Sequence, residues 1–176
     1  MKENPEKNWK SIIGLVAELK RCDECNIPTA SVAMAFICID TFANLSRPAD
    51  KKKVTRKDFK EWVDLHLKGH PDQPYNYRGK DVYAARCALL HKYSAKAELH
   101  IEDPETIMFV YHDGRRHQYN PSINKNLAII GTKSFINDVI NAIDSFLELC
   151  QKDSELRLRV EGRLADVFQT MPYPSK

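Results

Sequence analysis

The chain has 176 residues, 43% of them hydrophobic and 29% charged, and its formal net charge is +3. This length suits one domain with a real core and is short for two, and the composition excludes a disordered or fibrous protein. The longest uninterrupted apolar run, residues 32–39, is too short to span a bilayer, so we expect no membrane association. The mild positive charge permits an anionic partner without requiring one.

Five cysteines are present, at positions without a regular framework, and the polar first ten residues lack the apolar core of a signal peptide. We therefore expect a cytoplasmic protein with reduced thiols. Cys22 and Cys25 resemble half of a zinc site, but a structural zinc needs four ligands and no second pair follows. Two cysteines at the end of a helix is the favoured interpretation, and we expect no metal and no cofactor.

Apolar residues at helical spacing predict a helix over residues 8–20. A second helix, beginning near Pro28, is apolar nearly all round until Asp40, which makes it the expected centre of a bundle. Thr55, followed three residues later by Asp58, predicts a capping box at the start of a third helix. Residues 83–93 belong to a fourth.

Beyond residue 97 the pattern becomes β-rich, and Asp113 with Gly114 forms a turn signal. We predict an antiparallel β-hairpin here, then a connector over residues 120–132. Ser134 is the expected cap of a long helix, and a last helix is expected over residues 154–168. The prediction is a mainly α fold: one domain over residues 1–176, in which a bundle of five or six helices carries an appended hairpin. Its core spans about 8–95, and the hairpin and C-terminal helices span about 97–169.

Two basic clusters could meet a nucleic-acid backbone. The first precedes and begins the third helix, and the second follows the predicted hairpin turn together with His117. Their members are Lys51, Lys52, Lys53, Arg56 and Lys57 in the first, and Arg115 and Arg116 in the second. A run of charges is more often a solvated surface that keeps a protein soluble, and neither cluster alone outweighs that interpretation.

One arginine and one histidine interrupt an otherwise apolar helical run, YAARCALLHKY, at Arg86 and His91. Five residues along a helix place two side chains roughly 140° apart around the axis, so these two are not facing neighbours. Tyr93, seven residues after Arg86, is expected on nearly the same face. A purely structural account pairs Arg86 with a buried Asp40, and breaking such a pair costs roughly 3–5 kcal/mol.

The run Arg86-Cys-Ala-Leu-Leu-His91-Lys-Tyr93, with its flanks IDTFANLSRP, FKEWV and DVYAARCALLH, resembles the HEPN superfamily over about residues 28–95. It is most similar to the Arg-x-x-x-x-His-x-Tyr form of HEPN toxins. The resemblance implies a metal-independent endoribonuclease of a toxin or phage-defence system, in which Arg86 binds the phosphate and His91 is the general acid and base. It also implies a homodimer, whose second chain supplies a second motif.

Within this resemblance, Asp40 is the expected partner that orients Arg86, and Tyr93 shapes or regulates the site. Tyr93 corresponds to the tyrosine that a minimal nucleotidyltransferase antitoxin modifies in HEPN toxins. Cys87 departs from the pattern, because ribonuclease members often carry Asn, Asp or His there and a thiol is a weak hydrogen-bond donor. The alternative is a non-catalytic HEPN-like module that binds RNA, nucleotides or a protein.

Overall fold

The structure, a computed structural model, describes residues 5–168; residues 1–4 and 169–176, which the single-domain prediction includes, lie outside the described part. The long helices are α1 (Pro5–Glu24), α2 (Pro28–Ser46), α3 (Arg56–His66), α4 (Gly79–Lys92), α7 (Thr132–Lys152) and α8 (Ser154–Glu161). Shorter elements are α5 (Leu99–Glu102), β1 (Met108–His112), α6 (Pro121–Asn124), β2 (Leu127–Gly131) and a 3-10 turn (Leu164–Asp166). The mainly helical prediction is confirmed.

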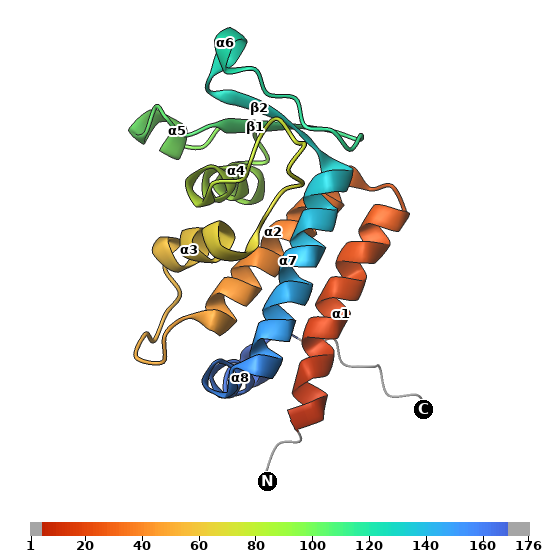
Figure 1. The fold of residues 1–176 in the computed structure, drawn as a ribbon, viewed down its shortest axis with the longest axis vertical. Coiled ribbons are helices and arrows are strands. Elements are labelled where there is room, and N and C mark those ends of the chain that lie inside the picture. Colours follow the sequence, from red (N-terminus) through yellow and green to blue (C-terminus); the bar gives the residue numbers. More distant parts are fainter. Residues whose placement is uncertain (1–4, 169–176) are drawn as a thin grey trace.

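Helix α2 is the centre of the bundle and contacts α1, α3, α4, α7 and α8. Figure 1 shows α1, α2 and α7 running together along the long axis, with α3 and α4 packed to one side. The two strands lie at one end of these helices and α8 at the other. Phe36, Ile39 and Phe42 of α2 are fully buried, because this helix is apolar on almost every side and has to be enclosed.

In the described part of the chain, α2 is also the single helix that is long and apolar enough to cross a membrane. A core helix meets the same criteria of length and composition, and half of the apolar window is buried inside the protein. Its neighbours on several sides are other helices of the bundle. We therefore describe α2 as the core helix of the bundle.

Local sequence signals set several helix ends. Thr55 accepts a hydrogen bond from the backbone N–H of Asp58, and the Asp58 carboxylate accepts one in return from the backbone N–H of Thr55. The predicted capping box is therefore confirmed. The predicted cap at Ser134 is wrong, because α7 already begins at Thr132, directly after β2. The last helix is shorter than predicted, since α8 ends at Glu161 and a 3-10 turn follows.

The structure does not contain the predicted antiparallel hairpin. Strands β1 and β2 pair in parallel, with Met108 opposite Leu127 and His112 opposite Gly131. The chain does turn after β1, but the returning segment pairs with β2, through an antiparallel bridge between Gln118 and Ile129. Part of the expected connector is thus β2 itself. The predicted turn at Asp113 is present, but the returning segment pairs with β2 and not with β1.

A buried polar network ties this small sheet to the bundle. The N–H of Gly131 donates to His117 Nδ1 at 3.1 Å, so the proton of the neutral ring is on Nε2 and faces Tyr77 Oη at 2.7 Å. Tyr77 in turn donates to Asp138 Oδ2 on α7 at 2.9 Å. Burial lowers the pKa of His117 to about 4 and raises that of Asp138 to about 6. At pH 7 the network therefore joins a neutral histidine, a tyrosine and a carboxylate.

We expect Tyr77→Phe to lower the free energy of unfolding by about 1–3 kcal/mol, because it leaves Asp138 and His117 buried without their shared partner. Urea denaturation followed by circular dichroism measures this. Tyr119→Phe is the control, since the Tyr119 hydroxyl donates to the exposed carbonyl of Lys125. Equal effects of the two substitutions would contradict a special role for the network.

Candidate functional site

The start of α4, which carries the motif, is held by a buried carboxylate. Asp81 is fully buried and accepts hydrogen bonds from Tyr75 Oη at 2.7 Å, from Arg78 and from the backbone N–H of Ile107 at 2.8 Å. Gly79 lies so close to α3 that an added Cβ would stand 2.3 Å from the carbonyl oxygen of Lys60. These contacts fix α4 against α3 and β1, and so fix where the motif lies.

Arg86 projects from α4 toward α2, where its Nε donates to Asp40 Oδ2 at 2.8 Å. The expected Asp40–Arg86 pair is therefore present. It is not deeply buried, however, because the two side chains are 21% and 35% exposed. Asp40 is half-buried on α2, and Arg86 pairs with it from α4. The guanidinium is thereby held in one orientation with part of its edge free.

Arg86 also reaches His91 within the same chain: its Nη1 lies 2.7 Å from His91 Nε2. The helical angle predicts that the two side chains are not facing neighbours, and the structure nevertheless brings them together within one chain. The angle of about 140° describes the directions in which the two Cβ atoms leave the helix. The long side chain of Arg86 is held at Nε by Asp40, and its Nη1 can then reach the imidazole of His91. Since arginine only donates, Nε2 is the acceptor and the ring carries its proton on Nδ1. His91 is exposed and open to a ligand.

Tyr93 does not continue the face of Arg86, contrary to the prediction. Helix α4 ends at Lys92, and Tyr93 adopts the left-handed conformation with φ of 47° and ψ of 47°. Its N–H closes the helix by bonding to Leu89 O at 3.0 Å. The side chain is 78% exposed. Tyr93 therefore borders the site as an accessible phenol and is positioned by the helix end, not by packing against Arg86.

Burial and the neighbouring charges shift the pKa values of Asp40 and Arg86. Burial raises the pKa of Asp40 above its ordinary value, although Arg86 and His91 act in the opposite direction. Burial tends to lower the pKa of Arg86, but the hydrogen bond and charge of Asp40 outweigh it and leave that pKa raised. Cys87, half-buried beside them, contributes in the same direction. The guanidinium is therefore a permanent cation.

The structure brings only part of the basic residues near the motif. Lys51 is engaged by Asp58 at 2.6 Å, so its charge is compensated. Arg115 and Arg116 lie in the turn after β1, where their carbonyls contact Gln73 and His112. Arg56 is different, because its charge acts on Tyr83, one helical turn before Arg86: burial raises the pKa of Tyr83, and the charges of Arg86 and Arg56 oppose that rise. The remaining members of the first cluster, Lys52, Lys53 and Lys57, are exposed.

Sequence reasoning missed two residues beside the motif. Lys60 of α3 places its Nζ over the ring of Tyr83, 5.7 Å from the centroid. Tyr83 is half-buried and packs edge-on against Phe59. Together with Arg56 they form a basic, aromatic border that leads from α3 to Arg86. The spacing of Arg56 and Lys60, four residues apart on one helix face, was the available signal.

Within residues 5–168, no group of three or more His, Cys, Asp or Glu side chains is arranged to hold a metal ion. Cys22 lies in the last turn of α1 and Cys25 just beyond it, and both thiols are free. Comparisons of the chain with protein-family models, with curated proteins and with solved structures found no match. Function has therefore to be argued from the site itself.

A double-mutant cycle with Asp40→Asn and Arg86→Met should give a coupling free energy of about 1 kcal/mol. This is below the cost of breaking a fully buried pair, because solvent screens both side chains. Urea denaturation of the four proteins measures it. The exposed pair Lys92–Glu98 is the matched comparison and should give less. A coupling of 3 kcal/mol or more would favour a purely structural role for Arg86.

Proposed function

We propose that this protein is a metal-independent endoribonuclease of the HEPN type. The observation that carries the proposal is the chain of contacts from Asp40 through Arg86 to the exposed His91. A fixed cation and an accessible imidazole are two of the groups that cleavage of RNA by its own 2′-OH uses. The motif resemblance to HEPN toxins is independent support, and a role in a toxin or phage-defence system in the cytoplasm follows from it.

The chemistry uses the two side chains in different ways. Arg86 donates to the non-bridging phosphate oxygens and stabilises the extra charge of the pentacoordinate phosphorus. A phosphate that takes over Nη1 would release His91 Nε2, which then accepts the proton of the attacking 2′-OH. A second group protonates the departing 5′-oxygen. Asp40 acts through Arg86 and is a positioning residue.

The second group is the reason for proposing a homodimer. One chain offers one histidine at the site, and a two-fold axis beside Arg86 would place the partner's motif opposite it. Ile37 lies on α2 one turn before Asp40 and is 39% exposed, so apolar surface adjoins the motif. Arg86 and His91 then form a pair within each chain, and two such pairs face one cleft.

Modification of Tyr93 could regulate the proposed ribonuclease. Its phenol is exposed and lies two residues beyond His91. A nucleotide attached there would bring a bulky, negatively charged group to the edge of the site and repel the RNA backbone. A minimal nucleotidyltransferase antitoxin is the partner that the resemblance suggests.

The alternative function is a non-catalytic module that binds RNA or nucleotides. It is favoured by the border of Arg56, Lys60 and Tyr83, which suits a phosphate backbone and a stacked base whether or not cleavage occurs. Cys87 also stands where ribonuclease members often carry a stronger hydrogen-bond donor. Such a module would bind RNA with an affinity that falls steeply with salt, and would release it intact.

The proposed reaction predicts cleavage of mixed-sequence single-stranded RNA in the presence of EDTA, with products that end in a 2′,3′-cyclic phosphate. His91→Ala should lower the rate by about 10²–10⁴-fold, because it removes the general base. His70→Ala is the matched control, since His70 is exposed and paired with Asp72 far from the motif in the chain. Gel electrophoresis and mass spectrometry of the products measure both. Equal cleavage by wild type and His91→Ala would remove His91 from the mechanism.

The proposed dimer predicts a mass in solution of twice the 20.3 kDa of one chain. Ile37→Glu should convert it to a monomer and reduce cleavage, because it places a charge in the apolar contact beside Asp40. Ile123→Glu, at a more exposed isoleucine on α6, should change neither property. Light scattering coupled to gel filtration gives the masses. A monomeric protein with full, His91-dependent cleavage would contradict the shared cleft.

A further inference from the structure

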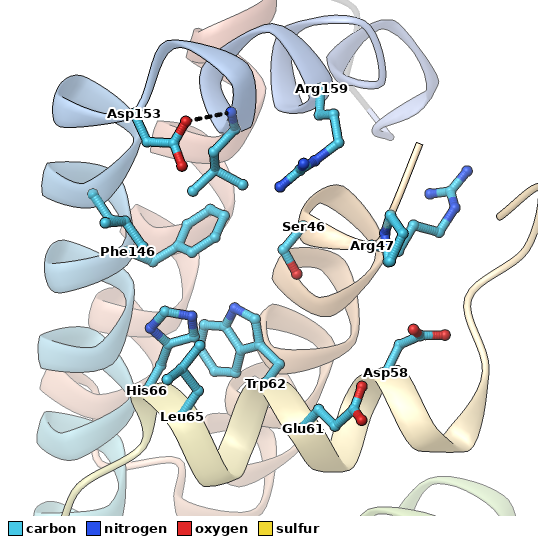
Figure 2. A pocket seen from close by; sticks show the side chains of 13 residues that line it. Ser46, Arg47, Asp58, Glu61, Trp62, Leu65, His66, Phe146, Asp153 and Arg159 are labelled. Carbon is cyan, nitrogen blue, oxygen red and sulfur yellow. Dashed lines mark hydrogen bonds between the residues drawn. The ribbon is translucent and has the colours of Figure 1, made fainter. Parts of the chain in front are cut away.

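A cavity of about 270 Å³ lies on the other side of α3 from the motif, between α3, α7, α8 and the end of α2. Figure 2 shows its walls, with Trp62 and His66 rising from α3 and Arg159 descending from α8. Phe146 and Leu156 complete an apolar floor. Neither the proposed ribonuclease site nor the resemblance to HEPN proteins assigns a role to this cavity.

Two buried N–H donors in this cavity have no acceptor among residues 5–168. Trp62 is only 3% exposed, and its indole Nε1 has no hydrogen-bond partner. The Nε of Arg159 is likewise buried without a partner. In Figure 2 the indole nitrogen and the guanidinium point into the cavity from opposite walls. Buried donors are nearly always satisfied in proteins, so these two are available to an acceptor that enters the cavity.

The charges of the lining favour an anionic acceptor. Three carboxylates are present, but Asp58 is engaged by Lys51 and Thr55, and Asp153 caps the first turn of α8. Glu61 is 60% exposed at the rim, near Lys57. Arg47 is also satisfied, by Asn44 and the carbonyl of Lys51. Of the described charged side chains that line the cavity, Arg159 is the cation left without a partner there.

Cations are also crowded at this end of the protein. Arg163 donates to the carbonyls of Leu45 and Pro48 at the end of α2. Its pKa is lowered, first by burial and then by the charges of Arg47 and Arg159. The guanidinium of Arg163 is therefore close enough to those of Arg47 and Arg159 to be repelled by both. A bound anion would relieve this repulsion.

We propose that this cavity binds a small organic anion, which presents a carboxylate or phosphate to Trp62 Nε1 and Arg159 and packs an apolar body against Phe146 and Leu156. The mouth fits such a body, because Leu65 and Leu149 are 67% and 40% exposed there. The volume lies just below the range of about 300–1,000 Å³ that is usual for drug-sized ligands, so a small molecule is the fitting occupant. A cation would leave both donors unsatisfied.

The test uses the two tryptophans as reporters. The chain has Trp9 and Trp62, and Trp9 Nε1 already donates to Glu161 at 3.3 Å. In a ¹H–¹⁵N spectrum of the full chain, phenylacetate or phenyl phosphate should move the Trp62 indole resonance downfield and saturably, while that of Trp9 stays. Trp9→Phe assigns the two signals. Phenylacetamide, which is neutral, should bind at least tenfold more weakly than the anions.

Arg159→Met should weaken binding of the anionic probe at least tenfold. Lys152→Met, which removes an exposed positive charge near the start of α8, is the matched control and should leave it unchanged. Comparing phenylacetate with phenyl phosphate distinguishes a carboxylate ligand from a phosphate. No saturable shift with either anion would overturn the proposal, and so would equal binding of phenylacetamide. That comparison needs only the wild-type chain and stands even if Arg159→Met fails to fold.

Discussion

Helix α2 is apolar on nearly every side, so it is stable in water only when other helices enclose it. Five helices do so, and the rest of the molecule is arranged around that contact. Asp40 is the one charged residue of this helix, and it is only half-buried there. The position of the candidate site therefore follows from how the other helices cover α2. Helix α4 packs against α2 near Asp40, and Arg86 is the residue of α4 that pairs with this carboxylate.

The helical part of this arrangement was predictable because its signals are local. Apolar spacing identified the helices, and Thr55 with Asp58 identified the start of α3. The pairing of Asp40 with Arg86 was also predictable, since a carboxylate on an otherwise apolar helix needs a cation. The strand pairing was not, because the residues of β2 look like a connector and the turn at Asp113 does not specify which strand the returning chain will join.

The contact between Arg86 and His91 could not be predicted from the sequence, for a different reason. Helical geometry gives the direction of a Cβ atom, but the position of a guanidinium depends on what anchors it. Asp40 holds Nε and leaves Nη1 free to reach the imidazole, and this depends on a helix distant in the sequence. The cavity of Trp62 and Arg159 could not be predicted either, because its walls come from four helices that are distant in the sequence. Neither arrangement has a signature within a single segment.

The energetics of Asp40 and Arg86 favour a functional over a structural interpretation. Burial raises the pKa of Asp40, which means that its charge is less stable here than in water even beside a guanidinium. A partly desolvated ion pair of this kind adds little to stability, and a well-packed apolar pair would serve the bundle at least as well. What the pair does provide is a guanidinium with fixed orientation, a free edge and an exposed histidine at 2.7 Å. Such an arrangement suits the proposed phosphate chemistry, whereas the packing of α2 against α4 does not depend on it.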